Sequence, residues 1–425
     1  MDMDIKYNAD VIVVGAGPCG ISAAIEVARA GKKVVLIERA QYPGSKNMYG
    51  GAVYTTALKE VFGEDYKSFK YERIINNNTW SFLNETGSFD MTYKDSTSQN
   101  AFAIKRFDLE SQMIKIAKDS GVYYIPNTLV KHLVVENDFV VGVKTQQEKY
   151  YAPITILADG VNSLLARELK LRNDYKSKDM ILSIKEAIKI DKKIIEDRFN
   201  LKEDCSNGVC KQYFGTDFGE LKQYKNLFMM TFLYTFKDTI MLGVGANLKD
   251  LSKYKLNVNR ILEEVKKHPD IESLIQGGQT IEYSAHLIPE GGYKKVPKLT
   301  SNGVIIAGDA AGFVNGVHFE GTNFALISGK IAAESALIAL DKRDYSQNTL
   351  CVYRKKLEKS FIMKDLYSYR NIIEKLYSRS NSISVYYPRK IKELFEIITS
   401  ANCISKSKQI KKYLFSYFSE RNIIE

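Results

Sequence analysis

Three glycines and one glutamate near the start of the chain have the types and spacing needed to hold a nucleotide. The glycines form the pattern Gly15-x-Gly17-x-x-Gly20 and follow a short apolar run, Val11 to Val14. Gly15 would make a tight turn, Gly17 would let backbone approach a pyrophosphate, and Gly20 would let a helix pack closely on a strand. Glu38 closes a second apolar run, where its carboxylate can accept hydrogen bonds from a ribose 2′-hydroxyl, which favours FAD or NAD over NADP.

The elements around these residues complete a strand–turn–helix–strand unit. Residues 11–14 and 34–37 are apolar and rich in valine and isoleucine, as buried parallel strands are, and residues 21–30 carry Ala and Ile at helical spacing. The helix N-terminus would offer free N–H groups and partial positive charge to phosphates. Cys19 lies inside the loop and is interpreted as a small buried residue rather than a redox thiol. The unit as a whole predicts a dinucleotide site rather than an ordinary glycine-rich turn.

Two later strand-to-turn junctions carry carboxylates. Asp159-Gly160 follows a predicted strand at 151–157, and Gly308-Asp309 follows one at 303–307. A carboxylate at such a junction can hydrogen-bond sugar-like hydroxyls, as in the ribityl chain of a flavin. Taken alone, each is also explained by an ordinary turn or helix cap. Their combination with the opening motif favours a flavin.

A further helix start follows the second carboxylate. Gly321-Thr322-Asn323 precedes a long predicted helix over 322–340. The positive end of that helix would stabilise the anionic reduced ring of a flavin and so tune its redox potential. An ordinary helix start is the alternative interpretation of this segment on its own.

Composition bounds the class of protein. The chain has 425 residues, 45% of them hydrophobic and 26% charged, typical of a globular protein with roughly two or three lobes. It has no run of 18 apolar residues, so we expect no membrane-spanning helix, and its polar, acidic start, MDMDIKYNAD, does not resemble a signal peptide. The lack of a disulfide framework fits a reducing cytoplasm. Five dispersed cysteines and four dispersed histidines fit no iron–sulfur or zinc spacing, so we expect no metal site.

Positive charge gathers at the C-terminus. Residues 351–425 hold 16 Lys and Arg against 7 Asp and Glu, so 16 − 7 = +9 of the net +11 lies there. Residues 409–418, QIKKYLFSYF, mix Lys with aromatic residues as a helix lying on an anionic membrane would. A solvated Lys-rich helix is the alternative. No nucleic-acid-binding motif accompanies the charge, so we expect no nucleic-acid partner.

The middle of the chain predicts a second lobe. A hairpin is expected over 79–93 with its turn at 84–87, then a helix at 107–120 and strands at 122–125, 128–135 and 140–145. A mostly antiparallel sheet is expected from 181–188 and 212–245, a helix at 257–267 and extended chain at 283–289. Since nucleotide-loop signals occur before, between and after these segments, we predict a discontinuous nucleotide domain with the second lobe over its open face. Most of 341–425 reads as helical.

With these motifs assembled, the chain resembles a known family. The segments GAGPCG, ERAQYPGSKNMYGGAVY, ILADGVNSLLAREL, EYSAHLIPEGGYKKVPKL and GVIIAGDAAGFVN resemble FixC-type electron-transfer flavoprotein–quinone oxidoreductases. That family belongs to the glutathione-reductase-like FAD superfamily, alongside geranylgeranyl reductases and flavin hydroxylases. The resemblance spans about residues 8 to 345.

The resemblance implies a fold and its boundaries. The fold class is α/β: a glutathione-reductase-like FAD-binding Rossmann domain with an inserted antiparallel β-sheet substrate domain and a helical C-terminal region. The FAD domain would comprise residues 1–75, 100–165 and 300–340. The substrate or quinone domain would comprise 76–99 and 166–299, and the basic helical region 341–425.

The resemblance also implies which residues hold one tightly bound FAD. Val130 would lie near the adenine, and residues 313–323 would line the isoalloxazine. Arg106 is chosen as a flavin contact because the arginine that relatives often place before this helix falls at Ile104 here. The predicted cofactor-binding residues are Gly15, Ala16, Gly17, Pro18, Cys19, Gly20, Glu38, Arg39, Asn47, Gly50, Gly51, Arg106, Val130, Asp159, Gly160, Gly308, Asp309, Gly321, Thr322 and Asn323.

The implied function is electron transfer. FAD would accept electrons from a partner electron-transfer flavoprotein and pass them to a membrane quinone, with no catalytic side chain required. Larger family members carry a C-terminal cysteine cluster that this chain lacks, so a separate ferredoxin-like iron–sulfur subunit would supply that centre. The protein would be cytoplasmic and peripheral on the inner face of the cell membrane.

Several alternatives remain open. One is a geranylgeranyl reductase, against which Tyr49 counts because that family tends to have cysteine there. Another is a non-catalytic flavin-bearing subunit, and a third is a flavin monooxygenase. The strand FMMTFLYTF, residues 228–236, either lines a quinone channel or belongs to the core. His286 and His318 either relay protons to a quinone or are ordinary structural histidines.

Overall fold

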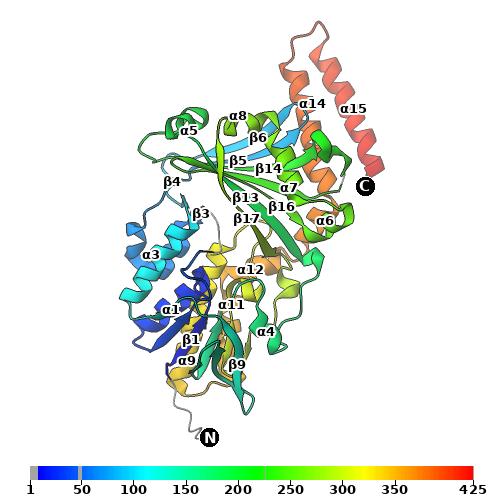
Figure 1. Cartoon of the computed structure of the whole chain (residues 1–425). Coiled ribbons are helices and arrows are strands. Elements are labelled where there is room, and N and C mark those ends of the chain that lie inside the picture. The colour runs from blue at the N-terminus through cyan, green and yellow to red at the C-terminus, as the bar shows by residue number, and fades with distance from the viewer. Residues whose placement is uncertain (1–7, 46–49, 225, 425) are drawn as a thin grey trace.

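Segments far apart in the sequence build one largely parallel sheet. The structure is a computed structural model that describes residues 8–45, 50–224 and 226–424 (Figure 1). The six-stranded sheet has the order β18-β19-β12-β1-β2-β8, and only the edge strand β18 is antiparallel to its neighbour. Its strands are β1 (Val11–Val14), β2 (Val34–Ile37), β8 (Tyr123–Ile125), β12 (Ile154–Leu157), β18 (Thr300–Ser301) and β19 (Val304–Ile306). The opening strand–helix–strand unit is therefore confirmed.

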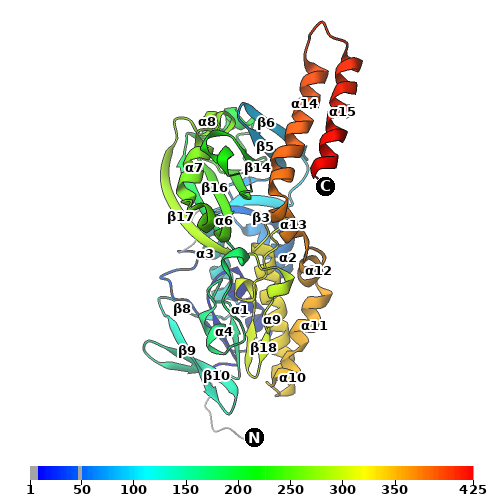
Figure 2. The same cartoon turned by 90° about the vertical axis from the view of Figure 1, so that its right-hand side faces the viewer.

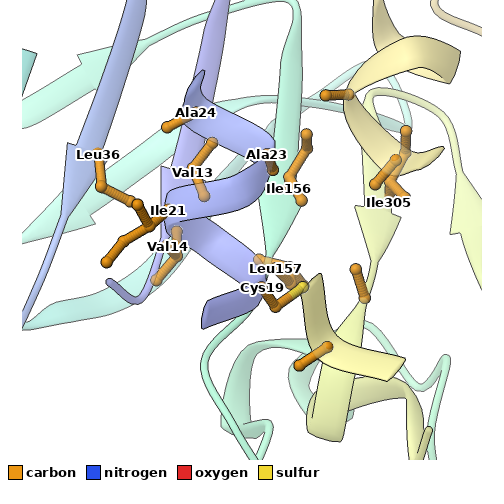
Figure 3. Packing of buried hydrophobic residues seen from close by; sticks show 14 of the residues in the cluster. Val13, Val14, Cys19, Ile21, Ala23, Ala24, Leu36, Ile156, Leu157 and Ile305 are labelled. Atoms are coloured by element: carbon orange, nitrogen blue, oxygen red, sulfur yellow. The ribbon is translucent and has the colours of Figure 1, made fainter. Parts of the chain in front are cut away.

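Two helices pack on this sheet and on each other. α1 (Pro18–Arg29) and α9 (Thr322–Lys342) meet so closely that a Cβ on Gly329 would lie 2.1 Å from the Cys19 carbonyl oxygen. Figure 3 shows Ile21 and Ala23 of α1 beside strand residues such as Val13 and Ile156. α3 (Arg106–Asp119) also packs on α1. The small size of Gly329 lets α1 and α9 approach closely, and the apolar surface that the two helices bury stabilises the sheet.

The long apolar helix α9 belongs to this core. By length and composition it is the one helix of the described segments that could cross a membrane, but 67% of that stretch is buried inside the protein. Its buried residues include Phe324, Leu326 and Ile331. α9 therefore reads as an interior helix.

Strands β9 to β11 form a small sheet against β12, and here one expectation was wrong. The sheet contains β9 (Val130–Glu136), β10 (Phe139–Thr145) and β11 (Lys149–Tyr151). The sequence predicted a single strand over 151–157, but the chain leaves β11 at Tyr151 and enters β12 at Ile154. Pro153 lies between them, and a proline cannot donate to a strand ladder, so the chain changes sheets there.

A seven-stranded sheet forms the other half of the body. Its order is β17-β13-β16-β15-β14-β5-β6, antiparallel throughout except for the β5–β14 pair. The strands are β5 (Asn77–Asn84), β6 (Gly87–Lys94), β13 (Met180–Lys189), β14 (Val209–Asp217), β15 (Met229–Thr235), β16 (Thr239–Asn247) and β17 (Gln279–Pro289). The predicted hairpin turn at 84–87 and the mostly antiparallel character are confirmed.

Four short helices accompany one face of this sheet, and three were not predicted. They are α5 (Lys192–Phe199), α6 (Leu248–Tyr254), α7 (Val258–Lys266) and α8 (Pro269–Ile275), of which only α7 was expected. Ile195, Leu251, Ile261 and Ile271 join the apolar core between these helices and the strands. The strand β15 alternates, so Met230, Phe232 and Tyr234 lie half-buried on the opposite face.

Shorter elements connect the two halves. The strands β3 (Gly51–Tyr54), β7 (Ala101–Ile104) and β4 (Arg73–Ile74) form a sheet beside the predicted flavin loop. The remaining short elements are α2 (Thr55–Phe62), η1 (Gly63–Ser68), α4 (Leu164–Glu168), η2 (Ser177–Asp179), η3 (Gly219–Gln223), η4 (Tyr293–Lys295) and η5 (Gly308–Ala311).

The C-terminal region is helical, as predicted. Its elements are α10 (Gln347–Leu350), α11 (Val352–Lys359), α12 (Phe361–Ser368), α13 (Ile372–Ser378), η6 (Ser382–Tyr386), α14 (Tyr387–Thr399) and α15 (Lys406–Ile424). In Figure 2 the chain climbs along the body from α10 to α13, and α14 and α15 project as a hairpin at the end opposite the N-terminus. The exact domain boundaries stay a prediction.

Candidate functional site

The carboxyl ends of the parallel strands bring the predicted cofactor residues to one edge of the sheet. β19, β12, β1 and β2 are neighbours and run in the same direction. Their ends lead into Gly308-Asp309, Asp159-Gly160, Gly15 and Glu38, respectively. In open α/β sheets, ligands bind in the crevice outside these strand ends. We call this edge the strand-end crevice.

The three glycines of the opening loop have different surroundings. Gly15 has φ +100°, and a Cβ there would lie 2.4 Å from the carbonyl oxygen of Ala158. A Cβ on Gly20 would lie 1.8 Å from the carbonyl oxygen of Gly15, whereas a Cβ on Gly17 would meet no atom within 4 Å. Gly15 and Gly20 are thus required by the fold itself. The open space at Gly17 is what a group lying against the backbone needs.

The start of α1 offers unpaired donors to this space. Gly17 is the N-cap residue, and no side chain caps the helix. Pro18 occupies the first turn, where the missing N–H costs no helical hydrogen bond. The remaining free N–H groups and the helix dipole favour an anion such as a pyrophosphate.

Glu38 is fixed at the end of β2. Its Oε2 accepts a 2.8 Å hydrogen bond from the backbone N–H of Ala16, and its Oε1 accepts one of 2.8 Å from Ala40. The backbone N–H of Thr128 donates to the carbonyl of Glu38 over 2.8 Å, which brings buried Val130, two residues later, to the same end of the sheet. This arrangement agrees with a ribose at Glu38 and an adenine near Val130. Arg39 is exposed.

The two strand-end carboxylates are held in protein surroundings that disfavour their charge. Burial raises the pKa of Asp159 to about 6, and one oxygen, Oδ1, has no hydrogen-bonding partner among the described residues. Burial also raises the pKa of Asp309 to about 6, although Arg106 and Arg172 lower it. Asp309 keeps part of its surface open to solvent while protein atoms surround it closely. Carboxyl groups in such surroundings are suited to hydrogen-bond with the hydroxyl groups of a bound ligand.

Arg106 lies at this crevice but is already paired. Its Nε lies 3.1 Å from both carboxylate oxygens of buried Glu110, one helical turn later on α3. The Arg106–Glu110 spacing is a helical i,i+4 pair that the sequence could have revealed. Burial, together with the charge of Arg106, lowers the pKa of Lys185 to about 8 and also lowers the pKa of His286. The helix start at Arg106 therefore faces strands β13 and β17 of the other half.

The start of α9 completes the crevice. Gly321 caps the helix without a side-chain hydrogen bond, and Thr322 is the first helical residue. The buried Oδ1 of Asn323 has no hydrogen-bonding partner among the described residues. An acceptor left unpaired near a helix N-terminus is costly unless a ligand donates to it.

The loop before β3 is only partly described. A Cβ on Gly50 would lie 1.3 Å from the carbonyl oxygen of Ile104, so no larger residue fits. Gly51 pairs with Ile104 in the β3–β7 ladder. Asn47 lies outside the described residues. Gly50 and Gly51 thus hold the loop against the strand that leads to Arg106.

Arg172 is a feature that sequence reasoning missed. Its guanidinium donates to the carbonyl oxygens of Ala310 and Val161, over 3.0 and 2.7 Å, and lies 4.1 Å from the ring centre of Tyr175. It thereby links the turn after β12 to the turn after β19 and lies near both strand-end carboxylates. It sits in a loop without a motif, so no local pattern identifies it.

Cys19 has a packing role, as predicted. Its thiol is buried, 3.9 Å from the Ser328 hydroxyl, and burial raises its pKa to about 12. A Cβ on Gly308 would lie 2.9 Å from the Cys19 Cβ, so the residue fills the junction of α1, α9 and the turn after β19. A thiol held protonated is a poor nucleophile. Among the described residues, none of the acidic, cysteine and histidine side chains form a metal-binding group.

The two histidines considered as proton relays lie in different places. His286 is on β17 toward Arg106 and Lys185, and burial together with these cations lowers its pKa. The Nε2 of His318 lies 2.9 Å from the Tyr369 hydroxyl, and the two rings meet edge to face. A role for either histidine as a proton relay stays a prediction.

These observations fit a flavin dinucleotide. The open space at Gly17, the uncapped helix starts and the unpaired oxygens of Asp159 and Asn323 lie along the crevice, where each would gain a partner. Bound there, FAD would accept and release electrons. The chain itself would hold phosphates by backbone N–H groups, orient hydroxyls by carboxylates and place a helix dipole near the ring.

Comparisons with known proteins identify the class. Residues 10–167 match the family described as FAD dependent oxidoreductase. The FixC protein of Bradyrhizobium diazoefficiens is 33% identical over 98% of this chain and 96% of the relative. The chain is thus an FAD-dependent oxidoreductase of electron transfer.

More particularly, the chain belongs to the FixC family. A relative from Escherichia coli K12, named a probable electron transfer flavoprotein-quinone oxidoreductase, YdiS, is 36% identical over 87% of this chain and 85% of the relative. Among solved structures, a geranylgeranyl bacteriochlorophyll reductase-like protein from Thermoplasma acidophilum superposes with a TM-score of 0.73, covering 96% of this chain and 95% of that one. At 20% identity, that likeness shows the fold alone.

Proposed function

We propose that this protein passes electrons from an electron-transfer flavoprotein, through FAD in the strand-end crevice, to a membrane quinone. The single observation that carries the proposal is the relative YdiS, named for this reaction, at 36% identity over 87% of the chain. The proposal includes a glutathione-reductase-like FAD domain with the boundaries given above. It also includes the twenty predicted cofactor-binding residues, of which Asn47 is not described.

The half-buried face of the seven-stranded sheet supports an apolar acceptor. Met230, Phe232 and Tyr234 of β15 lie on the face opposite the packed helices. On neighbouring β16, Gly243 leaves room for the Phe232 ring, since a Cβ there would lie 2.3 Å from the ring Cζ. An isoprenoid chain, such as the tail of a quinone, is flexible enough to lie over such a surface. One face of the strand FMMTFLYTF would thus pack in the core, and its other face would contact the acceptor.

The C-terminal hairpin supports a contact with a membrane surface. Exposed apolar side chains follow one stripe of α14 and continue through the connecting loop onto α15: Tyr387, Ile391, Phe395 and Ile398 on α14, Ile404 in the loop, and Leu414 and Phe415 on α15. Over residues 387–415 there are 7 Lys and Arg against 2 Glu, a surplus of 7 − 2 = +5. Apolar residues flanked by cations suit anionic lipid headgroups. The sequence prediction of a membrane-lying helix covered residues 409–418 and did not include the stripe on α14.

The electron donor and the iron–sulfur partner are proposed from the family alone. The described cysteines are all free, and none form a cluster with the spacing of an iron–sulfur site. We propose that an electron-transfer flavoprotein and a ferredoxin-like subunit dock on this chain. Co-expression followed by purification of the intact complex tests both, since each partner carries a cofactor with its own absorbance or paramagnetic signal.

The first experiment is an anaerobic reoxidation assay. The flavin of the purified protein is reduced with light, a soluble menaquinone or ubiquinone analogue is added, and the flavin absorbance is followed. Rapid reoxidation by quinone is the expected result. A flavin that stays reduced with quinone but is reoxidised by a geranylgeranyl lipid would replace this proposal with the isoprenoid reductase.

A further inference from the structure

A polar cavity of about 650 Å³ lies between the end of β17, the loop after η5, α6 and α13. It is separate from the strand-end crevice but borders residues 315–316, which belong to the segment predicted to line the flavin ring. Leu366 and Ile373 form an apolar part of its wall. The cavity therefore places polar groups, an apolar wall and the predicted flavin loop together.

Asn315 presents an unused donor to this cavity. The side chain is only 2% exposed, and its Oδ1 accepts hydrogen bonds from the backbone N–H groups of Val317 and His318, over 3.1 and 3.2 Å. These two bonds fix the amide orientation, since a flip would set two donors against the NH₂ group. The Nδ2 has no hydrogen-bonding partner among the described residues. A buried N–H without a partner is costly, so a ligand that accepts a hydrogen bond would be favoured.

Glu290 lies against the same loop. A Cβ on Gly316 would lie 3.1 Å from the Glu290 carboxyl carbon. The Tyr377 hydroxyl donates a hydrogen bond to Glu290 Oε2. Burial raises the pKa of the Glu290 carboxyl to about 7, although the Tyr377 hydrogen bond lowers it. Near neutral pH, Glu290 can therefore both give up and regain a proton.

Charged groups surround Glu290 from every neighbouring element. On its own loop, Lys294 pairs with Glu374 of α13 over 3.0 Å, and Lys295 lies 3.6 Å from Asp179 of η2. These pairs leave little net charge near the carboxyl.

The other charged residues that line the cavity are mostly basic. They are Lys178 before β13, Lys249, Asp250 and Lys253 on α6, and Arg370 after α12. The raised pKa of Glu290 comes from its burial, which outweighs the hydrogen bond from Tyr377.

We propose that this cavity receives the quinone head group and that Glu290, supported by Tyr377, is its proton donor. Asn315 Nδ2 donates to one quinone oxygen, and Glu290 faces the other. The proposal rests on the quinone reductase function given above. Reduction of the quinone takes up two electrons from the bound cofactor and two protons. Glu290 delivers one proton to the oxygen that it faces and is then reprotonated from solvent through the cavity. The oxygen beside Asn315 takes the second proton from solvent in the cavity, which leaves a quinol and an unchanged carboxyl group.

The test compares two acceptors on the flavin-loaded protein. Ferricenium takes only electrons, whereas a soluble menaquinone analogue takes electrons and protons. We expect Glu290→Gln to slow flavin reoxidation by quinone about 100-fold, the scale of general acid catalysis, and to leave reoxidation by ferricenium unchanged. Glu358→Gln on exposed α11 is the matched control and should change neither rate.

The pH profile separates proton donation from a structural role. In the unmodified protein, quinone reduction should slow as pH rises through about 7, because Glu290 loses its proton. Tyr377→Phe removes a hydrogen bond that stabilises the carboxylate, so the decline should move to higher pH, while Glu290→Asp should restore part of the rate.

Three results would overturn the inference. Glu290→Gln could leave the quinone rate and its pH profile intact, or it could slow both acceptors equally. If that variant fails to fold, an unmoved pH profile in Tyr377→Phe has the same meaning. Failure of the proposed function looks different: the unmodified protein would reduce ferricenium but not quinone.

Discussion

The strand-end crevice and the polar cavity beside Glu290 use different parts of the chain to prepare for a ligand. In the crevice, backbone N–H groups, glycines and strand ends set the shape, and Gly20 leaves no room for a single added carbon. In the cavity, side chains from η2, α6, η4 and α13 meet across more than two hundred residues of sequence. The first site depends on how closely main chains approach, and the second depends on which side chains meet.

This difference has consequences for substitution. A backbone site tolerates no bulk but is indifferent to most side-chain chemistry, whereas a side-chain site tolerates changes of volume at its rim and is sensitive to charge. The following predictions alter one feature at a time, so that each either sharpens this contrast or removes it.

The largest expected effect comes from a glycine pair in the opening loop. Gly20→Ala places a Cβ 1.8 Å from the Gly15 carbonyl oxygen, so the turn must shift, and we expect loss of stability and of flavin together. Gly17→Ala meets no atom within 4 Å, so the protein should keep its fold and melting temperature without flavin. The affinity for flavin should nevertheless fall by more than about 100-fold, which corresponds to roughly 3 kcal/mol of binding free energy.

Two measurements distinguish the members of this pair. The ratio of flavin to protein absorbance reports binding, and thermal unfolding of the flavin-free protein reports the fold. If Gly17→Ala bound flavin as tightly as the unmodified protein, the assignment of the open space at Gly17 to a cofactor would be wrong.

The second prediction concerns a buried charge in the other half. Arg73 is fully buried, pairs with Glu196 over 3.1 Å and donates to the carbonyls of Phe236 and Lys202. Arg73→Ala leaves Glu196 without this partner, and we expect a loss of about 3–5 kcal/mol in unfolding free energy. The exposed pair Arg354–Glu358 is the control, where Arg354→Ala should cost less than about 0.5 kcal/mol.

Chemical denaturation measures both changes on the same scale. Equal effects of the two arginine substitutions would contradict the view that buried side-chain pairs hold the second half together. A large effect of Arg73→Ala on flavin binding without loss of stability would point instead to a contact with the cofactor site.

The contrast also explains what the sequence could predict. The opening loop was predictable because backbone geometry demands particular residue types within a short segment: Gly15 has a positive φ, and Gly20 faces a carbonyl oxygen. The buried parallel strands β1, β2 and β19 and the helix α9 were predictable from runs of apolar residues, whereas the short strands β3, β4, β7 and β18 were not predicted. The break at Pro153 was also visible in principle, because proline interrupts a strand.

The remainder depends on contacts between distant segments. Arg172 sits in a loop without a pattern, yet it links the turns after β12 and β19. Glu290 lay in a segment quoted for its resemblance, but nothing local indicates that Tyr377 and Gly316 meet it. The helices α5, α6 and α8 are only seven or eight residues long, too short for a clear helical period.

The third prediction concerns the loss of stability that the charged form of Asp309 causes in the crevice. The pKa of Asp309 is about 6 in the folded protein, above the usual value of about 4, so the folded state binds its proton more tightly than the unfolded state. The contribution of this group to stability therefore falls as pH rises from about 4 to 6 and stays low above that window. Asp309→Asn should stabilise the flavin-free protein at pH 7.5, on the order of 1 kcal/mol after allowance for solvent, with little change at pH 4.

Thermal unfolding at the two pH values measures this effect, and Asp341→Asn at the exposed end of α9 is the control. The same Asp309→Asn variant should bind flavin less tightly, because it loses a charged acceptor for hydroxyls. A variant that is destabilised at pH 7.5 would show that the carboxylate serves the fold rather than a ligand.

The smallest expected effect lies on the C-terminal hairpin, where side chains meet neither a cofactor nor a core. Ile398 and Phe415 are 54% and 79% exposed, and their transfer into a lipid interface would each contribute on the order of 1 kcal/mol. Replacing both with serine should weaken sedimentation with phosphatidylglycerol-containing vesicles by about three- to tenfold, which corresponds to roughly 0.7–1.4 kcal/mol. Flavin content and reoxidation by a soluble quinone should stay the same, because the hairpin projects away from both sites (Figure 2). The control replaces Ser400 and Ser407 with alanine in the same hairpin. If vesicle binding falls with added salt but not with the double substitution, the lysines alone make the contact. If binding responds to neither change, the exposed stripe does not bind lipid, and a protein partner would be its expected contact.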